Sequence, residues 1–172
     1  MSYFAIAYPG ISNSDFDWIQ GVRRKNDQQF KQVKPHITLV FGTVKLNSSD
    51  FTNHITNKIR GFKSFRITLD SAVIIEDNSK THFHVFLVPS AGFNEINELH
   101  ERLYQGEMKS ELRHDIPFVP HITVGSGSRE DMAALVNKIN ESNISINGNV
   151  DQVSIVSFDG VEVKDIAKLS LA

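Results

Sequence analysis

The sequence predicts an α+β fold of two pseudo-symmetric lobes, each a mostly antiparallel sheet with helices on its outer face, around a central cleft. A pattern of strand, helix, strand, helix and closing strands occurs twice, in pseudo-repeats of roughly residues 1–80 and 81–172. Apolar runs that end at proline and short connections favour antiparallel pairing. No low-complexity tract or linker divides the chain. We therefore expect one bilobal domain over residues 1–172.

The first half begins with YFAIAYP (3–9), an apolar, aromatic run stopped by proline, as in a buried strand. A helix over 12–25 follows, with Ser14 and Asp17 as its N-terminal cap. Pro35 precedes the strand HITLVF, and a second helix ends at Gly61 as C-cap. Residues 64–77 form the closing strand or bent strand pair. The apolar faces of the two helices are Phe16, Ile19 and Val22, and Phe51, Ile55 and Ile59.

The second half repeats this order. HFHVFLVP (82–89) is the first strand, a helix covers 93–108, and Pro120 precedes the strand HITVG. Ser128 and Asp131 cap the next helix, and residues 144–171 supply the closing strands. The apolar faces of the two helices are Ile96, Leu99 and Leu103, and Met132, Leu135, Val136 and Ile139.

The tetrapeptide Pro-His-Ile-Thr occurs once in each half, at equivalent places in the pattern. Side chains alternate across a strand, so His36 and Thr38 share one face, as do His121 and Thr123. The aliphatic residues between and after them can be buried under the helices. Both His–Thr pairs then face the cleft.

Two imidazoles and two hydroxyls in one cleft suit acid–base attack on a phosphodiester. Histidine can accept or donate a proton near neutral pH, and threonine hydroxyls can donate to the non-bridging phosphate oxygens. For a single copy, a solvent-facing strand is the more common explanation; two matching copies favour a site. A metal site would need further Asp, Glu or His ligands at fixed spacing, so we expect no metal and no cofactor.

Composition limits the partners. The formal net charge is −2 and 22% of residues are charged, so no global positive field attracts long nucleic acid. The absence of cysteine excludes disulfides and thiol catalysis. The apolar N-terminal run is too short for a signal peptide or a membrane span. We expect a monomeric cytoplasmic protein with no membrane partner and a small nucleotide or RNA end as substrate.

The paired motifs HITL (36–39) and HITV (121–124), the order of elements and the opening strand resemble the 2H phosphoesterase superfamily, which includes 2′–5′ RNA ligase-like proteins and cyclic phosphodiesterases. The resemblance covers essentially the whole chain. It implies metal-independent hydrolysis of a 2′,3′-cyclic phosphate or a 2′–5′ linkage, with reversible 2′–5′ ligation also open. It implies that His121 activates water and His36 protonates the leaving 2′ oxygen, roles that the residues alone do not assign.

One position departs from the bacterial RNA-ligase-like branch. An arginine follows the second motif histidine there by five positions, whereas this chain has Ser126, and the nearest arginine is Arg129. This weakens the transfer of the RNA-ligase substrate but leaves phosphoester chemistry intact. A non-catalytic RNA-end or nucleotide-binding module on the same fold is the alternative function.

Further residues are assigned by position. Ser126, His84 and Tyr3 are candidate substrate contacts, although a partly exposed strand end is the commoner role for His84 and its neighbour His82. Strict alternation predicts that Phe41 is buried rather than stacked on a base. His54 and His100 are expected to be solvated helix residues. The basic run 23–25 is expected to be a solvated helix end, and the glycine-rich segment 125–130 a strand exit with, at most, a minor phosphate contact.

Overall fold

The structure is a computed structural model that describes residues 1–77 and 80–172. Its helices and strands follow the expected order, with two short additions, β2 and a 3₁₀ helix. The helices are α1 (Asn13–Asn26), α2 (Ser48–Ile59), α3 (Phe93–Leu103), the 3₁₀ helix η1 (Gly106–Glu111) and α4 (Arg129–Glu141). The strands are β1 (Ser2–Ala7), β2 (Gly10–Ile11), β3 (Ile37–Thr43), β4 (Phe65–Glu76), β5 (Phe83–Ala91), β6 (Ile122–Gly127), β7 (Ile146–Val150), β8 (Gln152–Phe158) and β9 (Val163–Ser170).

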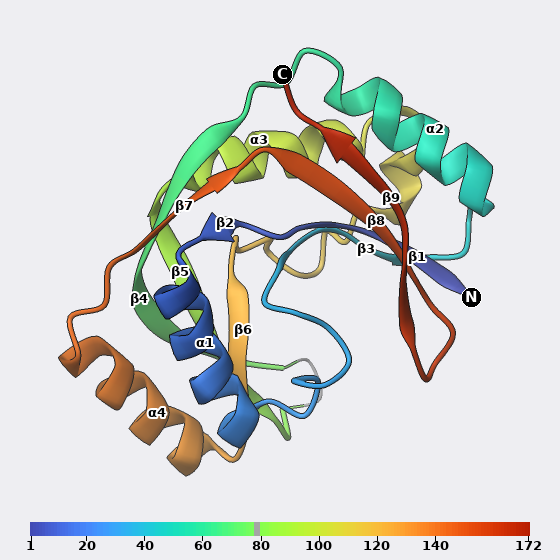
Figure 1. Cartoon of the computed structure of the whole chain (residues 1–172). Helices are drawn as coiled ribbons and strands as arrows, with labels where there is room; N and C mark the ends of the chain where they lie inside the picture. Colours follow the sequence, from blue (N-terminus) through green and yellow to red (C-terminus); the bar gives the residue numbers. More distant parts are fainter. Residues whose placement is uncertain (78–79) are drawn as a thin grey trace.

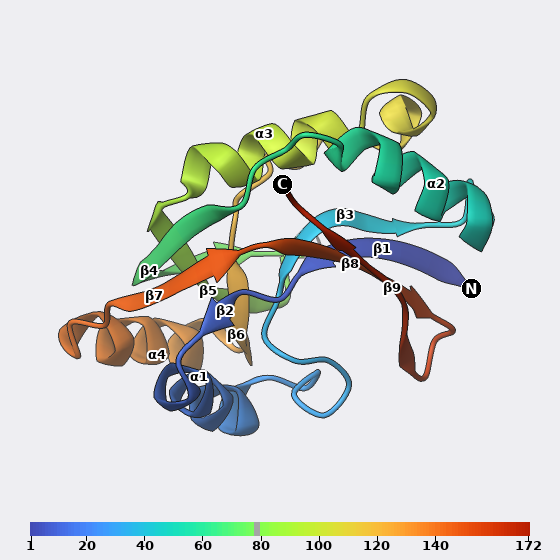
Figure 2. The same ribbon diagram turned by 45° about the horizontal axis from the view of Figure 1, so that its top comes forward.

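The strands form two antiparallel sheets, which confirms the expected fold class. Sheet A has the order β3-β1-β8-β9 and sheet B the order β2-β7-β4-β5-β6. Helices α2 and α3 lie together at one end of the molecule and α1 and α4 at the other (Figures 1 and 2). The strands β7 and β8 form an almost continuous ribbon that leads from sheet B into sheet A (Figure 1). The two sheets are therefore joined through strands as well as through packing.

The sequence pattern implied that each half of the chain forms one lobe. In the structure, each lobe instead contains elements of both halves. Each half places its first and motif strands in one sheet, β1 and β3 in sheet A and β5 and β6 in sheet B. The closing strand β4 of the first half joins sheet B, while β8 and β9 of the second half join sheet A. Helix α1 packs on β6 and helix α3 on β3, so each crosses to the opposite lobe. This exchange ties the lobes into one unit.

Both motif strands contain a β-bulge directly after the His-x-Thr sequence. Ile6 and Ala5 on β1 face Thr38 and Val40, so Leu39 is the extra residue of β3. On β6 the extra residue is Val124, because the consecutive β5 residues Phe86 and Val85 pair with Thr123 and Gly125. Two consecutive residues of each motif strand are consequently buried, which breaks the alternation that a regular strand would keep.

Helix caps follow the expected chemistry with one shift in position. Ser128 accepts a hydrogen bond from the backbone N–H of Asp131, and Gly61 has φ +75° just after α2, as expected. Helix α1 is capped by Ser12 with Asp15, rather than by Ser14 with Asp17. The Ser-x-x-Asp spacing occurs twice in succession there, and the chain turns into the helix immediately after β2 ends at Ile11.

The core lies between each sheet and its helices. The expected apolar helix faces are buried or partly buried, with Ile19, Phe51, Ile55, Ile96 and Leu99 fully enclosed. Burying an aliphatic or aromatic side chain of this kind stabilises the fold by about 1.5–3 kcal/mol. Within the described residues, no helix has the length and apolar character needed to cross a membrane.

Candidate active site

The two motif histidines are held in the same way. Nδ1 of His36 lies 2.8 Å from the carbonyl oxygen of Lys34, and Nδ1 of His121 lies 2.6 Å from that of Val119. A carbonyl oxygen can only accept a hydrogen bond, so each Nδ1 carries the proton and donates. The residue between donor and acceptor is a proline in both places, Pro35 and Pro120, and both prolines are buried. Each neutral imidazole is thereby left with an unprotonated Nε2.

The pKa values of both histidines are lowered. Burial, together with repulsion from His36 and His84 when these carry a proton, lowers the pKa of His121 to about 4, against an opposing effect of its hydrogen bond to Val119. Burial also lowers the pKa of His36, its hydrogen bond to Lys34 opposes this, and the nearby charges of Arg23 and Asp27 respectively lower and raise it. In the free protein at neutral pH both imidazoles are therefore neutral. His36 and His84 both lie close enough to His121 to affect its pKa.

Aromatic rings fix the orientation of both imidazoles. His121 stacks on Phe86, with ring centroids 3.5 Å apart and an interplanar angle of 10°, and His84 stacks on the same phenyl ring at 6.1 Å. On the other lobe, the ring of Tyr8 meets His36 edge-on at 6.2 Å. Phe86 and Tyr8 are site residues that the sequence analysis missed. Their only sequence signal is their position at the first strand of each half: Phe86 is on β5, where it pairs with Thr123, and Tyr8 directly follows β1.

Strand register places the polar residues of the second motif on one face. Cross-strand partners share a face of the sheet, so Thr123 lies on the face of Phe86 and Ser126 on the face of His84. His84 and Phe86 are two residues apart on β5 and therefore point the same way. The bulge at Val124 is what turns Ser126 to the side of Thr123, three residues earlier. Ser126 and His84 thus remain candidate contacts beside the histidines.

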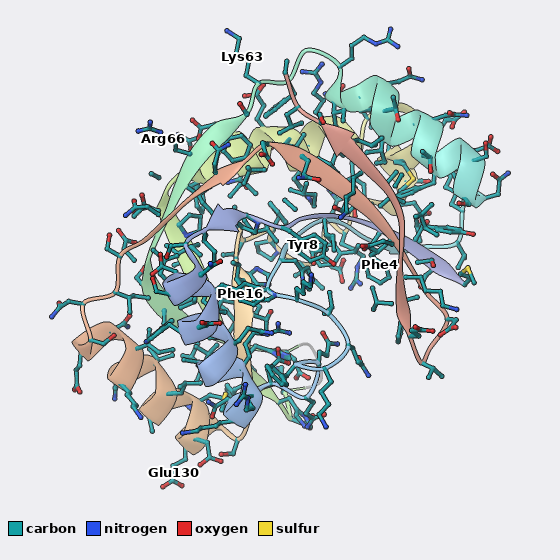
Figure 3. The ribbon with its side chains drawn as sticks, viewed as in Figure 1. Phe4, Tyr8, Phe16, Lys63, Arg66 and Glu130 are labelled. Atoms are coloured by element: carbon teal, nitrogen blue, oxygen red, sulfur yellow. The ribbon has the colours of Figure 1, made fainter. Side chains whose placement is uncertain are left out.

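Tyr3 is the one candidate contact that the structure does not bring to the histidines. Its ring stacks on Phe51 of α2, at 6.1 Å, on the helix-covered side of sheet A. Alternation puts Phe4 and Tyr8 on the other side, and both lie toward the middle of the molecule (Figure 3). The ring of Phe4 occupies the space over Gly42, where an added Cβ would come within 2.5 Å of Phe4 Cζ.

A small apolar cavity opens beside His36. Its volume is about 130 Å³. Sheet A supplies one wall and the segment between α1 and β3 supplies the other. The lining residues are Phe4, Ile6, Gln29, Gln32, Val33, His36, Val156, Phe158 and Val163. Two aromatic rings and two amide side chains in so small a space suit a flat, heteroatom-rich ring.

The expected burial of Phe41 is wrong. Its side chain is 42% exposed, because the bulge at Leu39 reverses the alternation after Thr38. A second irregularity in the pairing of β3 with β1 follows between Val40 and Thr43. Residues 41 and 42 then both face away from the core. Phe41 stands five residues after His36, as Ser126 does after His121.

His54 and His100 are buried, not solvated, with exposed fractions of 9% and 4%. Nδ1 of His100 donates to the carbonyl oxygen of Leu39 at 2.8 Å, and its ring stacks on Phe118 at 3.6 Å. Nε2 of His54 donates to the carbonyl oxygen of Leu103 at 2.8 Å. Buried carbonyl groups need such partners. His100 therefore holds the bulge that follows Thr38.

Arg23 is likewise buried, at 2% exposure, although the basic run was expected to be solvated. Its Nε lies 2.7 Å from Oδ2 of Asp27, and Oδ1 of Asp27 accepts from the backbone N–H of Gln29. Arg24 and Lys25 are exposed, as expected. The buried ion pair anchors the start of the segment that leads to His36.

Arg129 does not replace the arginine missing at position 126. It is the first residue of α4, is exposed, and its guanidinium carbon lies 5.9 Å from the ring centroid of Phe83. The glycine-rich segment forms the end of β6 and the α4 cap, as expected. Across the part of the chain that is described, no group of three or more His, Cys, Asp or Glu residues is arranged to hold a metal ion.

Comparison with known proteins points to one family. The model of the 2′-5′ RNA ligase superfamily matches residues 11–162. A Staphylococcus haemolyticus protein named "Putative phosphoesterase" is 21% identical over 158 residues, which are 89% of each chain. Similarly named proteins of several Staphylococcus aureus strains are 22% identical over the same share of each chain.

Solved structures share the fold. Usb1 of Kluyveromyces marxianus superposes with a TM-score of 0.61 at 13% identity, over 99% of this chain and 98% of that one. LigT of Escherichia coli in its apo form gives 0.59 at 16% identity, over 99% and 97%. LigT has also been solved with 3′-AMP and Usb1 with uridine monophosphate.

Proposed function

Because this chain belongs to the 2′-5′ RNA ligase superfamily of 2H phosphoesterases, we propose that it is a metal-independent phosphoesterase. Its substrate is a 2′,3′-cyclic phosphate or a short 2′–5′-linked nucleotide, and the same chemistry in reverse is 2′–5′ ligation. His36 and His121 are its catalytic residues, and Thr38 and Thr123 bind the phosphate. Every group that this proposal uses comes from a single chain, so a monomer without a cofactor suffices. A cytoplasmic location, where RNA ends and nucleotides occur, fits it.

The observation that carries the proposal is the matched state of the two imidazoles. Each donates its Nδ1 proton to a carbonyl two residues earlier, which leaves Nε2 for the substrate. A positive charge on His36 lowers the pKa of His121, so the two imidazoles do not readily hold both protons at once. General acid–base catalysis needs one imidazole with a proton and one without. A bound phosphate anion between them favours that state, since its charge stabilises one imidazolium.

Hydrolysis of a cyclic phosphate then proceeds in line. Nε2 of His121 accepts a proton from water as the water oxygen bonds to phosphorus. The bond from phosphorus to the 2′ oxygen breaks, and that oxygen takes the proton from Nε2 of His36. The hydroxyls of Thr38 and Thr123 donate to the non-bridging oxygens, where negative charge develops. His121 then releases a proton to solvent and His36 takes one up, which restores the starting state.

The assignment of base and acid rests on the surroundings of each ring. His121 is stacked on Phe86 and has a pKa lowered to about 4, which keeps it neutral and ready to accept a proton. The pKa of His36 is also lowered by burial, the hydrogen bond to the Lys34 carbonyl opposes this, and the paired charges of Arg23 and Asp27 act in opposite directions. The low pKa of His121 supports it as the base, which leaves His36 as the acid, the roles that the family resemblance implies.

The cavity beside His36 is the proposed site of the nucleobase. Phe4 and Phe158 offer faces for stacking, and Gln29 and Gln32 offer donors and acceptors for the edge of the base. His84 and Ser126 would contact the part of the substrate on the His121 side. The structures of LigT with 3′-AMP and of Usb1 with uridine monophosphate show that relatives of this fold accept single nucleotides.

The direct test is turnover of the four nucleoside 2′,3′-cyclic phosphates and of 2′–5′ dinucleotides in the presence of a chelator. We expect hydrolysis that the chelator does not reduce. A folded protein that binds a nucleotide but turns over none of these compounds, and binds equally well without His36 and His121, would instead be a nucleotide-binding module.

A further inference from the structure

A second, polar cavity is lined by Tyr8, the residue whose ring contacts the His36 imidazole. Its volume is about 360 Å³. Tyr8 lines it and also touches the ring of His36 edge-on at 6.2 Å. Gln32, Val33 and Val163 line both this cavity and the apolar cavity beside His36. A ligand that places its reacting phosphate at His36 can therefore reach both cavities at once.

The charged residues of the polar cavity favour an anion. Lys34 and Lys168 both line it, and neither forms an ion pair with any residue that the structure describes. Asp165 is its one acidic lining residue, so two positive charges face one negative charge. The pKa of Tyr8 is raised to about 12 by burial and by Asp165, so its hydroxyl keeps its proton and remains a donor. Gln152 adds an amide donor.

Strand register connects this cavity to the catalytic threonine. Thr38, Ile6, Ser154 and Lys168 are successive cross-strand partners, so they form one row on the same face of sheet A. Three strand spacings, about 14 Å, separate the backbones of Thr38 and Lys168, and the long lysine stem can bridge part of that distance. Ser154, in between, is 1% exposed and lines neither cavity.

We propose that the polar cavity lined by Tyr8, Lys34, Gln152 and Lys168 binds a second phosphate group of the substrate, on the His36 side of the reacting phosphate. This rests on the proposed function and narrows it. The favoured substrates are nucleotides that carry a phosphate beyond the one under attack, such as the ends of short oligonucleotides. A simple nucleoside cyclic phosphate fills only the catalytic site and the base cavity.

Equilibrium binding of two reaction-product analogues tests this without turnover. Adenosine 3′-monophosphate and adenosine 3′,5′-bisphosphate differ only in the second phosphate, and calorimetry measures both dissociation constants. We expect the bisphosphate to bind at least about tenfold more tightly. Lys168→Gln should reduce this ratio to about threefold or less, and Lys34→Gln should reduce it as well. Asp165→Asn should increase it, because it removes the one opposing charge.

Lys164→Gln is the matched control. It removes the same charge from the same strand, but Lys164 is exposed, pairs with Glu162 and does not line the cavity. The ratio should not change in this variant. Equal affinity for the two nucleotides in the wild type, or a preference that survives Lys168→Gln and Lys34→Gln, would overturn the proposal. So would failure of both nucleotides to bind.

The two proposals fail by different measurements. If no cyclic phosphate is hydrolysed but the affinity ratio responds to these substitutions, the catalytic assignment fails and the second phosphate site stands. If hydrolysis is efficient but the ratio is close to one, the second site alone fails.

Discussion

At the scale of single residues, each motif histidine uses one ring nitrogen for a hydrogen bond within the protein and leaves the other free for a substrate. Nδ1 of both His36 and His121 is bonded to a backbone carbonyl, which fixes the tautomer and directs Nε2 away from the strand. Packing against Phe86 and Tyr8 then fixes the ring planes. Such pre-positioning reduces the reorganisation that proton transfer requires.

Removal of either imidazole that we propose as catalytic should reduce kcat/KM by roughly 10²–10⁴-fold, the usual contribution of a general acid or base. We expect this for His36→Ala and His121→Ala, and for the double variant a loss much smaller than the product of the two, because the pair acts as a unit. Thr38→Val and Thr123→Val should cost less, since proton transfer is retained. The control is His114→Ala, an exposed histidine outside the site. Losses that multiply in the double variant would contradict paired action.

The pH dependence of kcat/KM should be a bell centred below pH 6.5. This profile reports the free enzyme, and its centre is the mean of the two pKa values whichever histidine is the base. Burial lowers both pKa values below the ordinary 6.5, that of His121 to about 4. Initial rates at subsaturating substrate between pH 4 and 9 measure the centre. An optimum at or above pH 7 would show that these two groups do not control the reaction.

At the scale of elements, the bulged motif strand depends on a helix from the other half of the chain. His100 of α3 donates to the carbonyl oxygen of Leu39, and the hydroxyl of Tyr104 accepts from the backbone N–H of Phe41 at 3.0 Å. The bulge residues therefore have partners although they leave the regular ladder of β3. This explains why His100, which was expected to be solvated, is buried together with Tyr104.

Substitution of His100 should destabilise the fold and disturb Thr38. His100→Ala leaves the Leu39 carbonyl without a donor and opens a cavity beside Phe118, at a cost of about 2–4 kcal/mol. His100→Asn keeps an N–H donor and should recover part of both stability and kcat. Urea unfolding and initial rates measure the two effects, with exposed His82→Ala as the control. If the alanine and asparagine variants are equally destabilised, the hydrogen bond is not the cause.

At the scale of the whole molecule, the exchange of strands and helices between lobes makes the cleft a property of the complete chain. Sheet A takes β1 and β3 from the first half and β8 and β9 from the second, and α1 and α3 pack on the opposite lobe. Neither half can form a complete lobe alone. The histidines of the two halves meet because the lobes cannot separate without unfolding these shared sheets.

Stability should decrease as the pH falls from 7 to 5. Burial lowers the pKa values of His36, His100 and His121 in the folded protein, so the unfolded chain binds more protons below its ordinary histidine pKa of about 6.5. The destabilisation is absent above that pH, begins as the pH falls through it, and for His121 is complete below about 4. Asp115 and Asp159 have lowered pKa values, so their protonation reduces stability only at lower pH.

Urea midpoints at pH 7 and pH 5 measure this change. His121→Gln, which cannot be protonated, should show a smaller decrease than the wild type. Inorganic phosphate should oppose the decrease, because an anion stabilises the imidazolium forms. A midpoint that is unchanged or higher at pH 5 would contradict the assigned pKa directions.

The sequence by itself determined the features that depend on local periodicity. The repeated tetrapeptide places His36 with Thr38 and His121 with Thr123, and the helix stripes around Ile19, Ile55, Leu99 and Met132 are the faces that the structure buries. Alternation and the helical repeat act over a few residues, so they can be read without the fold.

Only the tertiary structure decided what depends on partners distant in the chain. The bulges that expose Phe41 and turn Ser126 to the side of Thr123 are set by pairing with β1 and β5. Contacts between elements, which a local pattern does not encode, bury His100 and Arg23. They also decide that Phe4, rather than Tyr3, lies on the side of sheet A away from the helices. The exchange of closing strands between the halves is of the same kind, because hydrogen-bonded pairing across a sheet carries no signal at a fixed sequence spacing.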